Sequence, residues 1–234
     1  MNIGNKEKFM TINGETVFIV VLHGQNRSDE VLAWQKKVMV DHFGLTVNYF
    51  ICPFPGVSHG ACMNQIIKDT IDLPNAPDYY LFIDNDAIFL KDGCLDLLYD
   101  FVKNKMTIAG HAWQSNHKKG PNGMIPHAYA SQATLIFSKQ LYNALGRPDC
   151  DHWIERSDTA EELTYRAKEL GYIVVLIYPS HSVDQNTDLD NGCRFGLGNT
   201  YGPNLMYHVS QQGDERSAGL FIQKCKDVID GKFK

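Results

Sequence analysis

The chain has 234 residues, enough for one large domain or two small ones at about 100–200 residues per domain. Apolar residues make up 44% and charged residues 21%, a composition that excludes a disordered or collagen-like chain. The net charge of −5 excludes a protein that coats nucleic acid with a uniformly basic surface.

Cysteine usage and hydropathy predict a cytoplasmic location. None of the six cysteines forms a Cys-x-x-Cys pair, so we expect free thiols in a reducing compartment rather than a zinc site or a disulfide framework. The segment from Met1 to Met10 lacks the apolar core of a signal peptide, and no apolar run is long enough for a bilayer span. We therefore expect a soluble protein without stable membrane insertion, in the cytoplasm, or in the host cytoplasm if a phage encodes it.

Strand and helix patterns alternate along the first half of the chain. Short β-rich runs predict strands at Val17–Leu22, Leu45–Cys52 and Tyr79–Ile83. The last of these runs is apolar throughout, as is typical of a central parallel strand buried on both faces. Apolar residues at helical spacing predict helices at Ser28–Val40, His59–Ile71 and Asp92–Lys103.

The second half of the chain is less regular. Further strands are predicted at Met106–Ala109, Ala133–Phe137 and Ile173–Tyr178, the last as a final buried strand. Further helices are predicted at Lys139–Leu145, Thr159–Leu170 and residues 217–230. Two long segments, His111–His127 and Ser182–Asn204, are predicted as loops of the kind that form lids or binding loops. Together these patterns predict one α/β domain with a mostly parallel sheet and helices on both faces.

The sharpest chemical signal is Asp84-Asn85-Asp86, directly after the apolar run of the third predicted strand. Two carboxylates two residues apart at a strand end point to the same side, at the sheet edge where ligands bind in open α/β sheets. Such a pair repels unless a hard divalent cation lies between the carboxylates. The pattern therefore favours a metal site that holds a diphosphate, although a polar strand end that caps the next turn would look similar.

Two stretches near other strand ends add to this signal. His23-Gly24-Gln25-Asn26-Arg27 follows the first predicted strand, and Gly60-Ala61-Cys62-Met63-Asn64 opens the second helix. Small and polar residues are needed at such turns in nucleotide-binding sheets. In order and spacing, Val20–Arg27, Gly60–Asn64 and Asp84–Asp86 resemble the motifs of family 2-like glycosyltransferases of the GT-A fold.

This resemblance covers residues 16–90 well and implies a metal-dependent transferase for a nucleoside-diphosphate sugar. It implies nucleotide contacts from five residues: Gln25, Asn26, Arg27, Asn64 and Asn85. It also implies that Asp84 contacts the ribose or the metal and that Asp86 binds the metal. It further implies a nucleotide-sugar-binding half at about 16–105 and an acceptor half at about 106–234. The segment Leu22–Gln25 departs from the family's pattern, which leaves the base-reading contact open.

The acceptor half resembles the family more weakly. Asp158 precedes Glu161, Glu162 and Leu163 in a stretch that looks like the family's acidic helix start, which makes Asp158 the candidate general base, with Glu161 and Glu162 as substitutes. An acceptor hydroxyl needs such a carboxylate to take its proton. An aspartate at this position is equally a good helix N-cap.

His208 resembles the late histidine that completes the metal shell in many metal-dependent GT-A enzymes, and two carboxylates with an imidazole suit Mn²⁺, or Mg²⁺, better than Ca²⁺. Arg216 is a further candidate for pairing with the diphosphate. Trp113 offers an aromatic face for a sugar or a base. All three residues belong to the predicted acceptor half.

The leading hypothesis is therefore a hexosyl- or pentosyltransferase that uses a UDP-sugar, with inversion at the anomeric carbon. A phosphohydrolase of the haloacid dehalogenase type is an alternative, because its D-x-D motif also ends a strand, with Asp84 as nucleophile. A third hypothesis is a non-catalytic module that binds nucleotide sugars. The acceptor stays open among a glycan, a small molecule, a protein and a modified DNA base.

Overall fold

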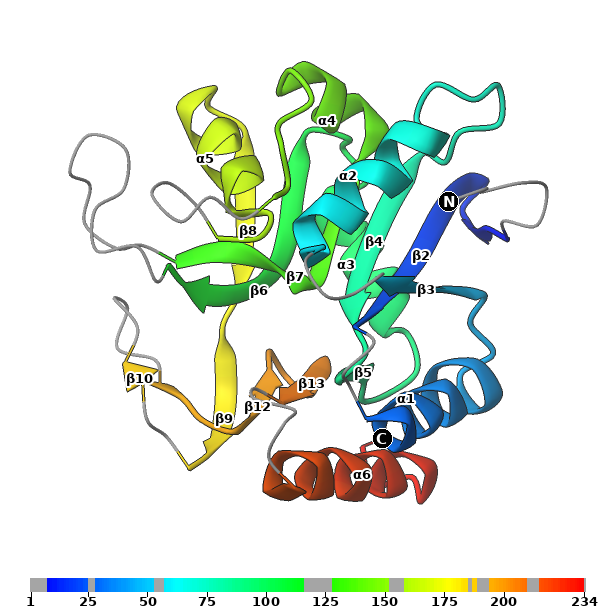
Figure 1. The fold of residues 1–234 in the computed structure, drawn as a ribbon, viewed down its shortest axis with the longest axis vertical. Helices are drawn as coiled ribbons and strands as arrows, with labels where there is room; N and C mark the ends of the chain where they lie inside the picture. Colours follow the sequence, from blue (N-terminus) through cyan, green and yellow to red (C-terminus); the bar gives the residue numbers. More distant parts are fainter. Residues whose placement is uncertain are drawn as a thin grey trace.

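The computed structural model describes residues 8–24, 28–52, 57–115, 128–151, 158–184, 187–188, 194–209 and 215–233. A seven-stranded sheet lies at its centre (Figure 1). Its strands are β1 (Met10–Ile12), β2 (Glu15–Gly24), β3 (Val47–Cys52), β4 (Tyr79–Asp84), β6 (Thr107–Gln114), β7 (Ala128–Ser138) and β8 (Ile173–Ile177). The spatial order is β1-β2-β4-β7-β6-β8. Strand β3 is also paired with β2, along the part of β2 that follows its pairing with β1.

The sheet is mostly parallel, as the sequence predicts. Strands β3, β2, β4, β6 and β8 run in one direction, and β1 and β7 run against it. The carboxyl ends of β2, β3 and β4 therefore lie at one edge of the sheet, where open α/β sheets bind ligands.

Helices cover both faces of the sheet because its central strands are apolar on both sides. Along β2, side chains at alternate positions enter different cores: Val17, Ile19 and Val21 one core, and Phe18, Val20 and Leu22 the other. The core that contains Phe18 is closed by α2 (His59–Thr70), α4 (Lys139–Ala144) and α5 (Glu161–Glu169). The core that contains Val17 is closed by α1 (Asp29–Lys36), its π-helical continuation η1 (Lys37–His42), α3 (Cys94–Val102) and α6 (Glu215–Ile229).

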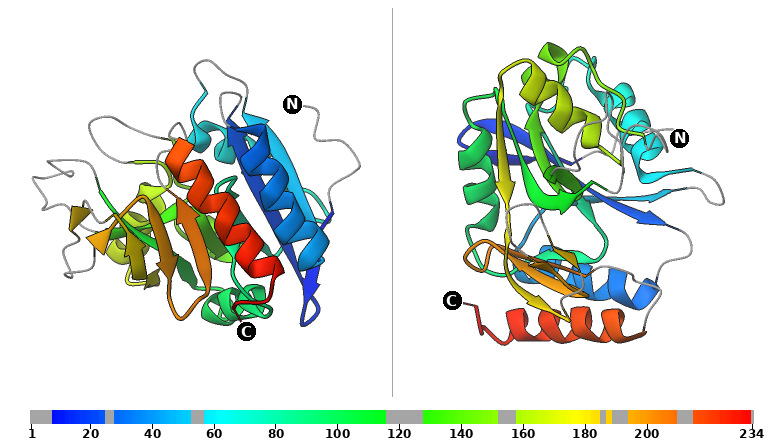
Figure 2. Two further views of the ribbon diagram at one scale, coloured as in Figure 1. Left: turned by 90° about the horizontal axis from the view of Figure 1, so that it is seen from below. Right: turned by 90° about the vertical axis from the view of Figure 1, so that its left-hand side faces the viewer.

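A second sheet of four antiparallel strands lies beside the first. Its strands, in spatial order, are β5 (Ala87–Phe89), β13 (Met206–Val209), β12 (Gly198–Tyr201) and β9 (Pro179–Val183). A two-residue turn joins β4 to β5, so the two sheets meet directly after Asp84. Helix α6 packs on β12 and β13 and lies alongside α1 (Figure 2).

The second sheet corrects two expectations. Ile173–Tyr178 is neither buried throughout nor the final strand, because β8 is an edge strand with Ile173 56% exposed, and β9, β12 and β13 follow it. The predicted loop Ser182–Asn204 contains the short pair β10 (Thr187–Asp188) and β11 (Arg194–Phe195), and all of β12. These strands are short and rich in polar residues and glycine, so they carry no apolar alternation that a sequence pattern would detect.

The prediction of a loop at His111–His127 is also wrong in part. Its first residues continue β6 as far as Gln114, and residues 116–127 lie outside the described part of the chain. The predicted helices are confirmed to within a turn at each end. In the described part of the chain, no helix combines the length and the apolar character needed to cross a bilayer.

Candidate active site

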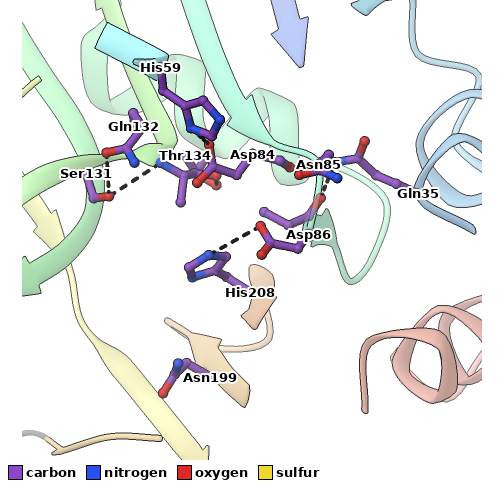
Figure 3. A network of polar contacts seen from close by, with 12 residues as sticks. Gln35, His59, Asp84, Asn85, Asp86, Ser131, Gln132, Thr134, Asn199 and His208 are labelled. Carbon is purple, nitrogen blue, oxygen red and sulfur yellow. Dashed lines mark hydrogen bonds and ion pairs between the residues drawn. The ribbon is translucent and has the colours of Figure 1, made fainter. Parts of the chain in front are cut away.

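The turn between β4 and β5 presents the two aspartates of the D-x-D motif. Asp84 is the last residue of β4, and Asn85 and Asp86 form the turn. The buried side chain of Gln35, from α1, donates hydrogen bonds to the carbonyl oxygens of Asp84 and Ala87, each at 2.7 Å. Because one amide group binds both ends of the turn, the backbone that carries the two carboxylates is firmly placed (Figure 3).

Asn85 points away from the two carboxylates into the protein. It is 1% exposed, and its side-chain nitrogen lies 2.9 Å from Nδ1 of His23, near the end of β2. The resemblance had implied a contact between Asn85 and the nucleotide. In the structure this side chain instead joins the β4–β5 turn to β2.

Asp84, Asp86 and His208 form a group that could hold a metal ion. One ligand atom from each lies within 4.8 Å of the others. The Oδ1 atom of Asp86 and the Nε2 atom of His208 are 3.4 Å apart, and both side chains are about one-tenth exposed, at 9% and 10%. The second sheet sets this distance, because His208 of β13 pairs with Ala87 of β5 (Figure 3).

The charges of the group fit a divalent cation. Burial alone would lower the pKa of His208, but the carboxylates of Asp86 and Asp84 outweigh this effect and raise it above the usual value. The two carboxylates therefore favour a positive charge at this position, which an ion would supply in place of the imidazole proton. Two carboxylate oxygens and one imidazole nitrogen are a donor set that suits Mn²⁺.

A further histidine contacts this group from α2. The Nδ1 atom of His59, in the first turn of α2, lies 3.6 Å from Oδ1 of Asp84 (Figure 3). The sequence did not identify His59 as a site residue. Its only signal in the sequence was its place among the small residues that open the helix. Ser58 caps this helix by accepting a hydrogen bond from the Ala61 amide, which places His59 in the first turn.

Aromatic rings pack against His208. The His208 ring centroid lies 5.1 Å from that of His111 and 6.0 Å from that of Trp113. Tyr201 of β12 stacks on His111 at 4.6 Å. Trp113 lies in strand β6 rather than in the predicted loop, and its ring adjoins His208.

The candidate bases lie at the acidic start of α5. The Asp158 amide donates to Oε2 of Glu161 at 2.7 Å, and Oδ1 of Asp158 accepts from the Thr159 amide at 2.8 Å. Between them, Ala160 has a left-handed backbone with φ +61°, a strained conformation for a residue with a Cβ. Glu161 is fully buried, whereas Glu162 forms an ion pair with Arg166 at 3.0 Å.

Tyr129 of β7 connects the acidic start of α5 to the D-x-D turn. Its pKa is raised well above the usual value, first by burial and then by the carboxylates of Asp158, Glu161 and Asp84; its side chain hydrogen-bonds to Asp158. The carboxylates of both motifs are thus close enough to act on one phenol.

Other predicted site residues are not part of this group. The Asn64 side chain binds the carboxylate of Asp149 and accepts a hydrogen bond from the Cys150 amide at 2.8 Å. Arg216, in α6, forms an ion pair with Asp184. Through these two bonds Asn64 connects α2 to the segment that contains Asp149 and Cys150. Residues 25–27, which are Gln25, Asn26 and Arg27, lie outside the described residues.

No protein-family model matches the chain, and no curated protein matches its sequence. Similar solved structures include the STIV protein A197, with 8% identity, 82% of this chain and 94% of that chain covered, and a TM-score of 0.45. They also include the catalytic domain of Drosophila beta1,4galactosyltransferase 7 complexed with xylobiose (14% identity, 76% of this chain, 70% of that chain, TM-score 0.42). A third is a glycosyltransferase involved in the glycosylation of the major capsid of PBCV-1 (15% identity, 54% and 62% covered, TM-score 0.32). At these values the likeness carries no functional argument, so the function has to be argued from the site itself.

Proposed function

We propose that the protein is a metal-dependent glycosyltransferase that moves a sugar from a nucleoside-diphosphate sugar to an acceptor hydroxyl. The observation that carries the proposal is the group of Asp84, Asp86 and His208, whose ligand atoms lie within 4.8 Å of one another at the end of a central strand. The acidic start of α5 supports it as well, because Asp158, Glu161 and Asp84 all act on the buried phenol of Tyr129.

In this proposal the three side chains hold Mn²⁺ or Mg²⁺. A divalent ion there supplies positive charge that stabilises the diphosphate as it leaves the sugar. His59 contacts Asp84 and limits the positions that this carboxylate can take. Gln35 holds the backbone of the turn, so the two carboxylates keep their spacing when a negatively charged donor binds.

Asp158 is the proposed general base. Its carboxylate takes the proton of the acceptor hydroxyl while the hydroxyl oxygen attacks the anomeric carbon. A single displacement with the acceptor opposite the leaving group inverts that carbon. Glu161 is the substitute, and the ion pair with Arg166 makes Glu162 the weaker of the two alternatives.

Several details of the donor and acceptor stay proposals. UDP as the nucleotide follows from the family 2-like resemblance, as do nucleotide contacts from Gln25, Asn26 and Arg27. Residues 16–105 would then bind the donor, and 106–234 the acceptor, with His208 supplied to the metal from the second part. The proposed acceptors are a glycan, a small molecule, a protein or a modified DNA base, and the proposed location is cytoplasmic.

The decisive experiment measures release of nucleoside diphosphate from a panel of UDP-, GDP-, ADP- and dTDP-sugars, with and without Mn²⁺. We expect hydrolysis of at least one donor that is lost with chelator and restored by Mn²⁺. Asp86→Asn should lower its rate at least about 100-fold, because a metal contributes several kcal/mol to charge stabilisation. Asp96→Asn, at an exposed position on α3, is the matched control and should keep the full rate.

Three results would contradict the proposal. Wild-type activity in Asp86→Asn, or activity that chelator does not affect, would remove the role of the metal. Rapid hydrolysis of simple phosphoesters without dependence on a sugar nucleotide would favour the phosphohydrolase alternative. Tight donor binding without hydrolysis or transfer to any acceptor would favour the non-catalytic module.

A further inference from the structure

His111 occupies an unusual position for a polar residue. It follows an irregularity in the pairing of β6 with β7, between Gly110 and His111, and its side chain is fully buried. The imidazole lies between two other rings, at 5.1 Å from His208 and 4.6 Å from Tyr201, and it is nearly parallel to both at 25° and 23°. Through this stack, His111 packs directly against His208, the histidine of the candidate metal group.

Neither ring nitrogen of His111 has a hydrogen-bond partner among the described residues, and the same is true of Nδ1 of His208. Leaving a buried polar atom unpaired has a free-energy cost, so such atoms in folded proteins generally have a partner. A phenylalanine at 111 would provide a similar stack without this cost. The imidazole is therefore better explained by a polar partner that is not one of the described residues.

The candidate metal group adjoins His111, because the His111 ring stacks on that of His208. His111 is not one of the three residues whose ligand atoms lie within 4.8 Å, which argues against direct ligation. A neutral imidazole has one nitrogen that donates a hydrogen bond and one that accepts.

We propose that His111 is a positioning residue in the outer shell of the metal site: one ring nitrogen hydrogen-bonds to a water that completes the ion's coordination, and the ring holds His208 in place by stacking. This inference rests on the metal site of the proposed function. Residues in this outer shell orient the ligands, and their loss typically weakens metal binding 10–100-fold.

The test is Mn²⁺ binding to the full chain, measured by electron paramagnetic resonance without any nucleotide. His111→Phe keeps an aromatic stack and removes the nitrogens, and we expect it to raise the Kd for Mn²⁺ about 10–100-fold. His181→Phe, at an exposed position on β9, is the matched control and should leave the Kd unchanged. Pulsed measurements of nitrogen coupling should still detect the directly bound His208 in His111→Phe and lose it in His208→Ala.

A second pair of variants separates the hydrogen bond from the stack. His111→Gln keeps a hydrogen-bonding group and His111→Leu does not, and neither has an aromatic ring. We expect His111→Gln to bind Mn²⁺ more tightly than His111→Leu, a comparison that still decides the question if His111→Phe does not fold. Wild-type affinity in His111→Phe, or equal affinities in His111→Gln and His111→Leu, would overturn the inference.

The outcome is independent of the sugar-transfer assay. Mn²⁺ binding that depends on His111 in a protein that cleaves no sugar nucleotide would support this inference and contradict the proposed function. Sugar transfer by a chain that binds no Mn²⁺ would overturn this inference and the metal dependence, while leaving the transfer itself established.

Discussion

Tyr129 shows how a single buried side chain links two motifs that are far apart in the sequence. Its hydroxyl hydrogen-bonds to Asp158, and the carboxylates of Glu161 and Asp84 also act on it. A buried phenol that donates to a carboxylate restricts the orientation of that carboxylate. Tyr129 therefore helps to fix the orientation of the Asp158 carboxylate.

This arrangement predicts the effect of Tyr129→Phe on the proposed reaction. Without its hydrogen bond, Asp158 is less well oriented toward the acceptor, so we expect kcat to fall about tenfold with the KM for the donor unchanged, as a fraction of the 10²–10⁴-fold typical of a general base. Steady-state kinetics with a transferable acceptor measures both constants.

Tyr165→Phe is the informative comparison, because the Tyr165 hydroxyl bonds to Glu161 rather than to Asp158. A larger loss of kcat in Tyr165→Phe than in Tyr129→Phe would assign the base to Glu161. Equal and full activity in both variants would exclude a catalytic base at this helix start.

At the scale of the secondary-structure elements, Glu15 of β2 connects its own strand to β4, to α3 and to the turn after α3. Its carboxylate accepts hydrogen bonds from the hydroxyls of Tyr79 on β4, at 3.0 Å, and Tyr99 on α3, at 2.7 Å, and it pairs with Lys105 at 2.5 Å. Burial opposes ionisation, but the bonds from Lys105, Tyr99 and Tyr79 hold the pKa of Glu15 below its usual value.

The lowered pKa makes a prediction about acid stability. A carboxylate whose pKa is lower in the folded than in the unfolded state stabilises the fold above the unfolded value, near 4.5, and this contribution is lost as the pH falls through the folded value. We expect Glu15→Gln to lower the free energy of unfolding at pH 7 by about 1–3 kcal/mol and to flatten its decline with acid. Urea titrations at pH 7 and pH 4 test this, with the exposed Glu169→Gln as control; parallel acid profiles of wild type and Glu15→Gln would contradict it.

The elements also show where sequence patterns work. The run Tyr79–Ile83 is buried on both faces and lies between β2 and β7, because a strand without polar positions is stable only in the middle of a covered sheet. The strands β9, β12 and β13 were not predicted, since their stability comes from pairing with one another. Gly198 illustrates the point: a Cβ at this position would overlap the Tyr207 hydroxyl, a constraint that only the paired strands create.

At the scale of the whole molecule, the candidate metal group joins the two sheets. Asp84 ends a strand of the seven-stranded sheet, whereas His208 belongs to the four-stranded sheet. An ion bound by both would add a link between two sheets that the chain joins at the β4–β5 turn and again at Tyr178, between β8 and β9. Metal binding should therefore act on the stability of the entire domain.

We accordingly expect Mn²⁺ to raise the thermal unfolding midpoint and to slow hydrogen exchange in β13 and β5. A ligand at 100 times its Kd that binds only the folded state adds about 2.7 kcal/mol to the free energy of unfolding. His208→Ala should abolish both effects, and His181→Ala on β9 should preserve them. An unchanged midpoint in wild type at saturating Mn²⁺, or an equal increase in His208→Ala, would show that the group does not bind the ion.

The sequence by itself determined the apolar strands, the amphipathic helices, the mostly parallel sheet and the placement of Asp84 and Asp86 at a strand end. These features depend on residues close together in the chain, so periodicity and spacing reveal them. The family resemblance implied that His208 lies with the two aspartates, whereas the tertiary structure alone decided that His59 contacts Asp84 and that Asn64 and Arg216 bind other partners. Those contacts join residues that are not neighbours in the chain, so no local pattern reveals them; the register between β5 and β13, which brings His208 to Asp86, pairs segments more than 100 residues apart.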